Sequence, residues 1–301
     1  MVASDSSVMR TDYHAPVGCV AAEMLRERLD TVWTELHAVC SLSDYAEHVH
    51  TLRVATRRTL AAVDVFRGVI PAKRRKWFEK KLRQVRRAAG EARDLDVLTD
   101  RLGKNSATSA RRRLVAMLAR QRRKSRDPIR AQLKKLKDAG WPSRVNRLLE
   151  DVSVRRRRTS FRAFARRRFR PIVASFVDTA GRALRDNDDI HSLRIEGKKL
   201  RYAMEIFSCV FPADVRGRCQ RALERLQKTL GECTDHASAA DRLYRWSCSI
   251  NAGQNRDMIV ALCVDENKKA NRAREAFCKW WNRTRRRSLE RRLDRTLRHS
   301  A

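Results

Sequence analysis

Hydrophobic side chains recur along this chain at intervals of three and four residues, which is the spacing of one buried face of an α-helix. In residues 73–89 the apolar positions are Phe78, Leu82, Val85 and Ala89. Pro71 precedes this stretch and Gly90 follows it, as the start and stop signals of a helix do. No sustained alternation of apolar and polar residues, the pattern of a strand, occurs in the sequence. The pattern therefore predicts an all-α protein.

The sequence also repeats itself at a shift of about 141 residues. Residues 50–102 align with residues 191–243 without a gap, and 16 of these 53 positions are identical. Matched pairs include His50 with His191, Pro71 with Pro212, Gly90 with Gly231 and Asp94 with Asp235. Composition alone does not place four such different residue types at one shift. We interpret the repeat as an internal duplication.

The duplication predicts two four-helix bundles related by pseudo-twofold symmetry, since each apolar stripe needs a helical partner. In each half, a long helix precedes the repeat, a second ends before the proline, a third ends at the glycine and a fourth follows the aspartate. The expected parts are a first half over residues 15–140, a linker over 141–158, a second half over 159–283 and an Arg-rich tail over 284–301. Short helices after Pro128 and Pro142 are expected to bridge the halves.

The charge is strongly positive. There are 69 Lys and Arg residues against 35 Asp and Glu residues, a formal net charge of +34. Self-repulsion of this size disfavours a compact state unless a polyanion or dense counterions screen it. Nucleic acid, an anionic membrane and polyphosphate are the partner classes that the charge allows. No run of about 20 apolar residues is present, so no membrane span is expected.

Part of this charge is predicted to lie on particular helix faces. His50, Arg53 and Arg57 follow one another at spacings of three and four, so one helix face carries all three. The second half repeats this face with the residues His191, Arg194, Lys198 and Arg201. A further stripe comprises Lys76, Lys80, Arg83 and Arg87. If the two halves pack symmetrically, the repeated faces form one cationic groove that captures a linear polyanion.

Two interpretations of the paired histidines stay open. His50 and His191 either contact a phosphate or order the neighbouring basic side chains. The choice between polyanions rests on the aromatic residues, which make up 6% of the chain and are nearly absent from the basic faces. Single-stranded nucleic acid binders stack bases on aromatic rings, whereas an all-phosphate ligand needs only charge and donors. Polyphosphate is therefore favoured, with a nucleic acid as the alternative partner.

Motifs of phosphate-cleaving or proteolytic catalysis are missing from the sequence: it contains no G-x-x-x-x-G-K-[ST], H-E-x-x-H or G-x-S-x-G. The repeated carboxylates are Glu91, Asp94, Glu232 and Asp235. A metal-dependent phosphohydrolase would need them to converge beside the basic groove. We expect them instead to cap the next helix or to pair with Arg86, Arg87 or Arg93. His236 near Cys233 lacks a complete set of metal ligands, so no catalytic residue, metal or cofactor is predicted.

The eight cysteines include no C-x-x-C pair, and most lie within helical patterns. This usage is typical of a reducing compartment. Residues 1–13 are polar, without the apolar segment of a signal peptide. The sequence thus predicts a cytoplasmic protein.

The motifs resemble those of the CHAD family, the conserved histidine α-helical domain. They are Val49 to Val54 followed by Arg57-Arg58, Gly90 to Val97, and His191 to Arg194 followed by Lys198 to Tyr202. The resemblance covers about residues 15–283. It implies two helical bundles with a basic surface or pore between them that binds inorganic polyphosphate. The contacts it implies are His50, Arg53, Arg57, Arg58, His191, Arg194, Lys198, Lys199, Arg201 and Tyr202.

The resemblance also implies association with polyphosphate granules. Many relatives carry a CYTH domain that begins with E-x-E-x-K, and this motif is not found here. A stand-alone binder, not an enzyme, is therefore expected. The second half departs from the pattern after Gly231, where it lacks the arginine and second aspartate of the first half. The two halves are thus expected to contribute unequally, and the sequence leaves the oligomeric state open.

Overall fold

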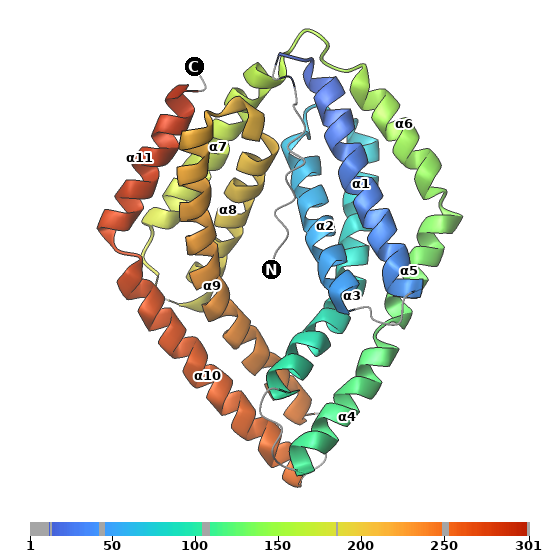
Figure 1. Cartoon of the computed structure of the whole chain (residues 1–301), viewed down its shortest axis with the longest axis vertical. Helices are drawn as coiled ribbons and strands as arrows, with labels where there is room; N and C mark the ends of the chain where they lie inside the picture. Colours follow the sequence, from blue (N-terminus) through green and yellow to red (C-terminus); the bar gives the residue numbers. More distant parts are fainter. Residues whose placement is uncertain are drawn as a thin grey trace.

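The structure, a computed structural model, describes residues 12, 14–41, 46–103, 109–184, 186–248 and 253–299. The first part of the chain forms α1 (Val17–Ser41), α2 (Ala46–Val65), α3 (Ala72–Gly103), α4 (Ser109–Lys124), α5 (Asp127–Asp138) and α6 (Trp141–Ser153). The second part forms α7 (Phe161–Gly181), α8 (Asn187–Ile206), the 3-10 helix η1 (Ser208–Val210), α9 (Ala213–Cys248), α10 (Gln254–Trp280) and α11 (Arg283–His299). Figure 1 shows the two parts side by side, meeting above and below.

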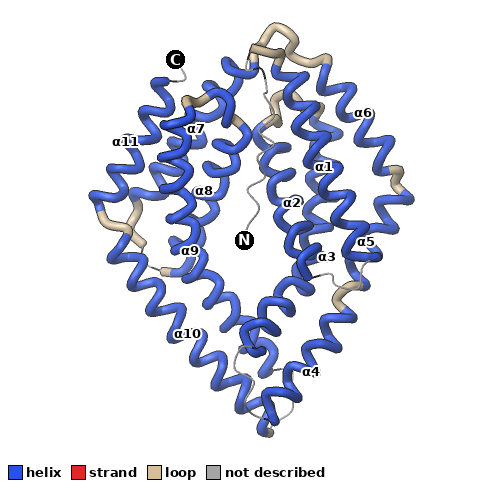
Figure 2. Tube along the Cα trace, viewed as in Figure 1, coloured by secondary structure: helices blue, strands red, loops and turns tan. Residues whose placement is uncertain are grey.

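The all-α prediction is confirmed, since the described residues contain no strand (Figure 2). One boundary prediction was wrong. Gly90 and Gly231 do not end helices, because α3 and α9 continue for more than a turn beyond them. A glycine in a helix interior costs only about 1 kcal/mol relative to alanine, which long helices with packed apolar faces tolerate. The sequence also predicts a further helix over residues 107–124; its start at Ala107 lies outside the described residues, and α4 covers the remainder.

The segments expected as a linker and a tail are packed helices. The predicted short helices after the two prolines are present as α5 and α6, and Trp141, Leu148 and Val152 of α6 are buried in the main core. The C-terminal segment forms α11, in which Leu289 and Leu293 are buried in that same core. Both segments carry apolar residues three to four apart, so each buries a stripe against the preceding helices. The Arg-rich tail predicted over residues 284–301 is therefore a packed helix from Arg283 to His299.

One hydrophobic core joins the two parts of the chain at their upper end. Phe66, which follows α2, stacks on Phe164 of α7 with ring centroids 5.8 Å apart. Phe207, which follows α8, lies 5.7 Å from Phe161. Aromatic pairs at these separations add stabilisation beyond the area they bury. This cluster fixes the position of α2 relative to α8.

A smaller hydrophobic cluster joins the two parts at their lower end. It contains Leu95, Leu98, Leu118, Ala240, Leu243, Ile259 and Cys263, which come from α3, α4, α9 and α10. In Figure 1 these four helices converge there. Because the parts are held together above and below, the polar faces of α2, α3, α8 and α9 are constrained to lie opposite one another between the two clusters.

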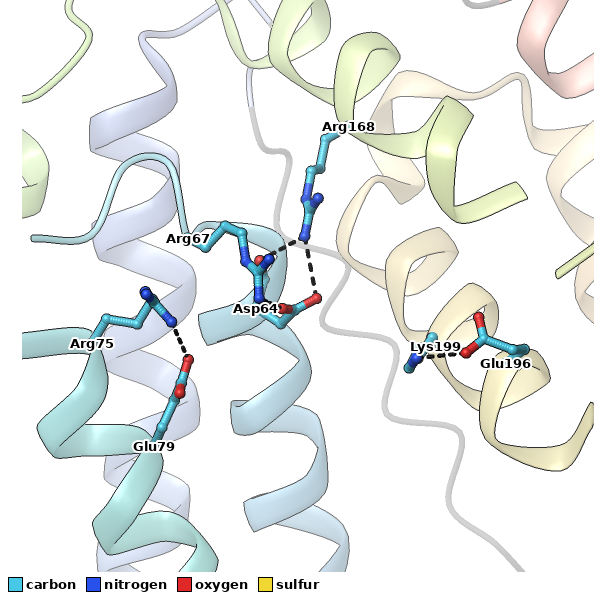
Figure 3. Close-up of polar contacts among 7 residues, drawn as sticks. All are labelled: Asp64, Arg67, Arg75, Glu79, Arg168, Glu196 and Lys199. Atoms are coloured by element: carbon cyan, nitrogen blue, oxygen red, sulfur yellow. Dashed lines mark hydrogen bonds and ion pairs between the residues drawn. The ribbon is translucent and has the colours of Figure 1, made fainter. Parts of the chain in front are cut away.

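Polar contacts reinforce the upper junction. Arg168 of α7 donates from Nη2 to the backbone oxygen of Asp64 at 3.0 Å and to its carboxylate at 3.2 Å (Figure 3). The backbone N–H of Val17 donates to the carbonyl of Thr159 at 2.9 Å, which ties the start of α1 to the start of α7. These bonds satisfy groups at helix ends and orient the two parts.

Leu223→Asp is expected to unfold the chain. Leu223 is fully buried in the core on α9, so the variant places an unpaired carboxylate in an apolar site and loses at least about 3 kcal/mol of stability. Urea denaturation followed by circular dichroism measures the change. Val260→Asp on α10 is the control, because Val260 is 43% exposed. Equal midpoints for the two variants would contradict this core assignment.

Candidate functional site

A cavity of about 560 Å³ lies between the two parts of the chain. We call it the basic chamber. Its polar lining residues are His50, Arg53, Arg57, Arg93, Asp94, Arg194, Lys198, Asp235, Ser238, Asp241, Arg242 and Arg245. They come from α2 and α3 on one side and from α8 and α9 on the other. Five of the residues predicted from sequence therefore meet here: His50, Arg53, Arg57, Arg194 and Lys198.

The repeated glycines lie beside the chamber arginines. A Cβ atom on Gly90 of α3 would lie 3.4 Å from Nη1 of Arg53, and one on Gly231 of α9 would lie 3.7 Å from Nη2 of Arg194, both ordinary van der Waals separations. Arg53 also donates from Nη1 to the backbone oxygen of Arg86 at 3.2 Å. The repeated glycines thus mark where an arginine of the neighbouring helix meets α3 or α9, and they end neither helix.

The chamber carries a local excess of positive charge. Seven arginine and lysine side chains line it against three aspartates, an excess of four positive charges with His50 neutral. Burial, together with the charges of Arg194 and Arg57, lowers the pKa of Lys198 to about 8. Burial, with the positive charge of Arg93 next, lowers the pKa of His50. These shifts show that the cations are crowded and partly dehydrated, so an entering anion would relieve them.

Two of the chamber arginines carry unsatisfied donors. The Nε atoms of Arg57 and Arg194 are buried and have no hydrogen-bond partner among the described residues. Lys198 likewise forms no ion pair with a described carboxylate. A buried donor without an acceptor is costly, so these groups are suited to receive the oxygen atoms of an anion.

The repeated aspartates are chamber residues, so the capping interpretation was wrong. Asp94 and Asp235 lie within continuous helices and do not cap one. Arg242 of α9 donates to Asp94 of α3 at 3.0 Å across the chamber, and Arg194 donates to Asp235 at 3.0 Å. Both aspartates do pair with arginine, but their partners are Arg242 and Arg194 and not Arg86, Arg87 or Arg93. These bonds fix the arginine side chains and leave the chamber positive.

The two predicted histidines do not share an environment. His191 lines a separate cavity of about 270 Å³, together with Cys233, Thr234 and Ala237. Ser238 is common to this cavity and to the chamber. His50 and His191 thus match in sequence but line different cavities.

Four other motif residues lie outside the chamber lining. Arg58 pairs with Glu205 of α8 at 3.2 Å, and Lys199 pairs with Glu196 at 2.5 Å (Figure 3). Arg201 lies over the ring of Tyr202, with its Cζ 4.6 Å from the centroid. Tyr202 itself is 6% exposed and belongs to the buried residues. Of these contacts, the Arg58–Glu205 pair joins α2 to α8, whereas the other two lie within α8.

The stripe of Lys76, Lys80, Arg83 and Arg87 is exposed on α3 and does not line the chamber. One of its cations is compensated by a carboxylate on the same helix. Arg83 lies 3.6 Å from Glu79, and Glu79 also pairs with Arg75 at 2.8 Å (Figure 3).

Three cations of the chamber were not predicted: Arg93, Arg242 and Arg245. Each lies on the part of α3 or α9 beyond the repeated glycine, which was expected to be a separate helix. The matched Asp-Arg-Leu at residues 100–102 and 241–243 was the signal that could have pointed to Arg242.

A cavity of about 790 Å³ adjoins the chamber and shares Asp94, Leu98, Arg242 and Arg245 with it. The Asp94–Arg242 ion pair therefore lies at the boundary between the two spaces. In the described part of the chain no cluster of three or more His, Cys, Asp or Glu side chains is arranged to hold a metal ion. His236 instead bonds through Nδ1 with Glu266 at 2.7 Å. No described helix is long and apolar enough to span a bilayer.

The fold and the site define an all-helical protein whose two parts enclose a cationic chamber. The chain belongs to the CHAD domain family, whose model matches residues 23–244. It is similar in structure to the CHAD domain from the plant Ricinus communis, with a TM-score of 0.71 and 20% identity over 88% of this chain and 93% of that one. It is also similar to PptA from Streptomyces chartreusis, with a TM-score of 0.60 and 17% identity over 89% and 99% of the two chains. A search of curated proteins gives no match.

Lys198→Met is expected to stabilise the chain at pH 7. The pKa of Lys198 is lowered from 10.5 to about 8 in the folded state, so between these pH values the unfolded state binds more protons and stability rises with pH. The variant removes the cost of the charged lysine, a gain of about 1 kcal/mol at pH 7 after allowing for solvent screening. The gain should disappear as the pH rises from 8 to 10.5.

Urea denaturation of the variant and the native chain at pH 7 and pH 10.5 measures the difference. Lys228→Met is the control, because Lys228 is exposed on α9 and its stability difference should not change with pH in this way. A Lys198→Met variant that is less stable than the native chain at pH 7 would contradict the electrostatic account of the chamber.

Proposed function

We propose that the chain binds inorganic polyphosphate in the basic chamber and acts as a binder, not as an enzyme. The observation that carries the proposal is the meeting of Arg57 of α2 and Lys198 of α8 in one cavity, with no carboxylate partner for either among the described residues. A phosphate chain presents an oxygen acceptor at every unit, so both parts of the protein can hold one ligand. Polyphosphate is also the ligand associated with the CHAD family.

The lining of the chamber favours polyphosphate over nucleic acid. It contains no Trp, Tyr or Phe among the residues that form it. Single-stranded nucleic acid gains much of its affinity from bases stacked on aromatic rings. A ligand that consists only of phosphate loses nothing in such a site. A nucleic acid bound through its backbone alone is the alternative.

The carboxylates of the chamber do not favour hydrolysis. Asp94 and Asp235 each accept a hydrogen bond from an arginine, so both carboxylates are already engaged by the protein. A phosphohydrolase needs carboxylates directed at a metal or a water molecule. Here they orient the cations that hold the ligand.

Duplication explains why the chamber has two similar walls. The helices α2 and α8 begin at residues 46 and 187, and α3 and α9 begin at residues 72 and 213, each 141 residues apart. We infer that the two halves arose from one repeat and are related by pseudo-twofold symmetry. Binding of long polyphosphate would place the protein in the cytoplasm at polyphosphate granules.

A competition titration tests the ligand. Labelled long-chain polyphosphate is bound at about 150 mM salt, near physiological ionic strength, and challenged with single-stranded RNA and duplex DNA while phosphate release is followed. We expect polyphosphate to remain bound at equal phosphate concentration and to stay intact. Displacement by RNA or DNA would make the chamber a nucleic-acid site, and release of phosphate would make the protein a hydrolase.

Charge reversal in the chamber tests the site. The double variant Arg57→Glu with Lys198→Glu breaks no ion pair among the described residues, so the helical fold should survive. Polyphosphate affinity should fall at least about a hundredfold, because two charge-assisted contacts are lost. Arg256→Glu with Lys268→Glu, on exposed positions of α10, carries the same change in net charge. If both double variants lose the same affinity, binding depends on overall charge and the chamber is not the site.

A further inference from the structure

A second cationic cavity lies between α9, the end of α10 and α11, along one edge of the molecule in Figure 1. Its volume is about 270 Å³. The lining residues are Arg221, Ala222, Arg225, Trp280, Trp281, Arg285, Ser288, Leu289 and Arg292. We call it the outer groove. Among the described residues, four arginines and no carboxylate line it, so it is more uniformly positive than the chamber.

The arginines of the outer groove are held in position. Arg225 and Arg285 lie over the ring of Trp280, with their Cζ atoms 5.5 and 5.3 Å from its centroid. Arg285 also donates from Nη1 to the carbonyl of Trp280 at 2.9 Å. A guanidinium fixed by a ring and a carbonyl loses little freedom when it binds an anion, which favours affinity.

Their charge is not neutralised within the protein. In the part of the chain that the structure describes, Arg221, Arg225, Arg285 and Arg292 form no ion pair with an aspartate or glutamate. Arg292 donates only to a backbone oxygen, that of Arg218, at 3.4 Å. Four unneutralised guanidinium groups around one cavity repel one another, and a bound anion would remove that repulsion.

The corresponding surface of the first half is packed in a similar way. At the shift of 141 residues, Arg285 matches Arg144, which lies over the ring of Trp77 with its Cζ 4.8 Å from the centroid. The core leucines match as well, since Leu148 and Leu289 are both buried. The packing of α6 on the first half thus resembles the packing of α11 on the second.

The neutralising carboxylates, in contrast, are not kept. In the first half Glu79 pairs with Arg75, and Asp151 of α6 pairs with Arg74 of α3. The positions matched to these two carboxylates in the second half are Gln220 and Arg292. The second half therefore carries neither of these carboxylates, and it has an arginine at one of the two positions. An arginine lies on a tryptophan ring in both halves, so the difference that points to a ligand is the missing neutralisation in the second half.

The outer groove is separate from the basic chamber. Arg225 precedes Asp235, the first chamber residue on α9, by ten residues of continuous helix. At 1.5 Å per residue this is about 15 Å along the axis. No residue lines both cavities.

We propose that the outer groove is a second anion-binding site and that it takes phosphate groups of an inorganic phosphate chain. The chemistry of the ligand rests on the proposed function, whereas the site itself does not. The ring of Trp280 is already covered by two guanidinium groups, so it offers poor stacking to a nucleobase. With two sites, one molecule can hold two chains or two stretches of one chain, which raises the avidity for long polyphosphate.

Calorimetric titration of the full chain with inorganic triphosphate tests the proposal. We expect two binding sites in the native chain. In the double variant Arg221→Glu with Arg225→Glu the outer site should weaken at least about tenfold, equivalent to about 1.4 kcal/mol, so that one site is detected. Arg57→Glu with Lys198→Glu should keep the outer site and lose the chamber site. Arg256→Glu with Lys268→Glu, the charge-matched control, should keep both. Circular dichroism checks each fold, and Arg221→Gln with Arg225→Gln replaces the first variant if it is unfolded.

The outcomes separate the two proposals. A single site that is lost only in Arg57→Glu with Lys198→Glu would overturn the outer groove and leave the chamber intact. A site that is lost only in Arg221→Glu with Arg225→Glu would support the groove while the proposed function of the chamber fails. An RNA oligonucleotide with the same number of phosphates is titrated in parallel. If it binds the groove more tightly than triphosphate does, the inorganic ligand is the wrong assignment.

Discussion

Hydrophobic contact between the two parts of the chain is the interaction on which the rest of the structure depends. The aromatic cluster around Phe66 and Phe207 holds the upper ends together, and the cluster around Leu98 and Leu243 holds the lower ends. Between them lie cations that repel one another. Burial of apolar surface is strong and independent of direction, so it can hold in place a charge arrangement that would not form by itself.

The folded protein therefore favours the binding of an anion. Helix packing fixes the backbone of α2 and α8, and aspartates orient Arg194 and Arg242. The lowered pKa of Lys198 reflects the electrostatic cost of burying it beside other cations. A polyanion that enters the chamber would remove part of this cost. The free energy of unfolding that the free protein lacks would then contribute to the free energy of binding. The outer groove follows the same principle with a tryptophan ring in place of the aspartates.

Much of the fold could be predicted from the sequence, because helical periodicity and proline positions are local signals. The helix before Pro71 ends, and the helix after it begins, where the pattern placed them. Gly90 was misinterpreted because a glycine can either end a helix or lie within one, and only tertiary packing decides between the two. The role of α11 was missed because its leucines are sparse among arginines, although they suffice to bury one stripe.

The site was predictable only in part, and for a physical reason. Spacing along one helix identified the face with Arg53 and Arg57, but it cannot show what lies opposite that face. Arg242 and Arg245 enter the chamber through the crossing of α3 and α9, which depends on long-range packing. His191 is matched to His50 in sequence, yet it faces a different cavity. The exposed stripe on α3 was weighed by charge alone, without the carboxylate that compensates it.

The most direct test of the account is a crystal structure of the protein with a polyphosphate chain bound. We predict phosphate density in the basic chamber, within hydrogen-bond distance of Arg57 from one half and Lys198 from the other. Density confined to the exposed stripe of Lys76, Lys80, Arg83 and Arg87, with no phosphate in the chamber, would contradict the claim that the two halves are held together to enclose a polyanion.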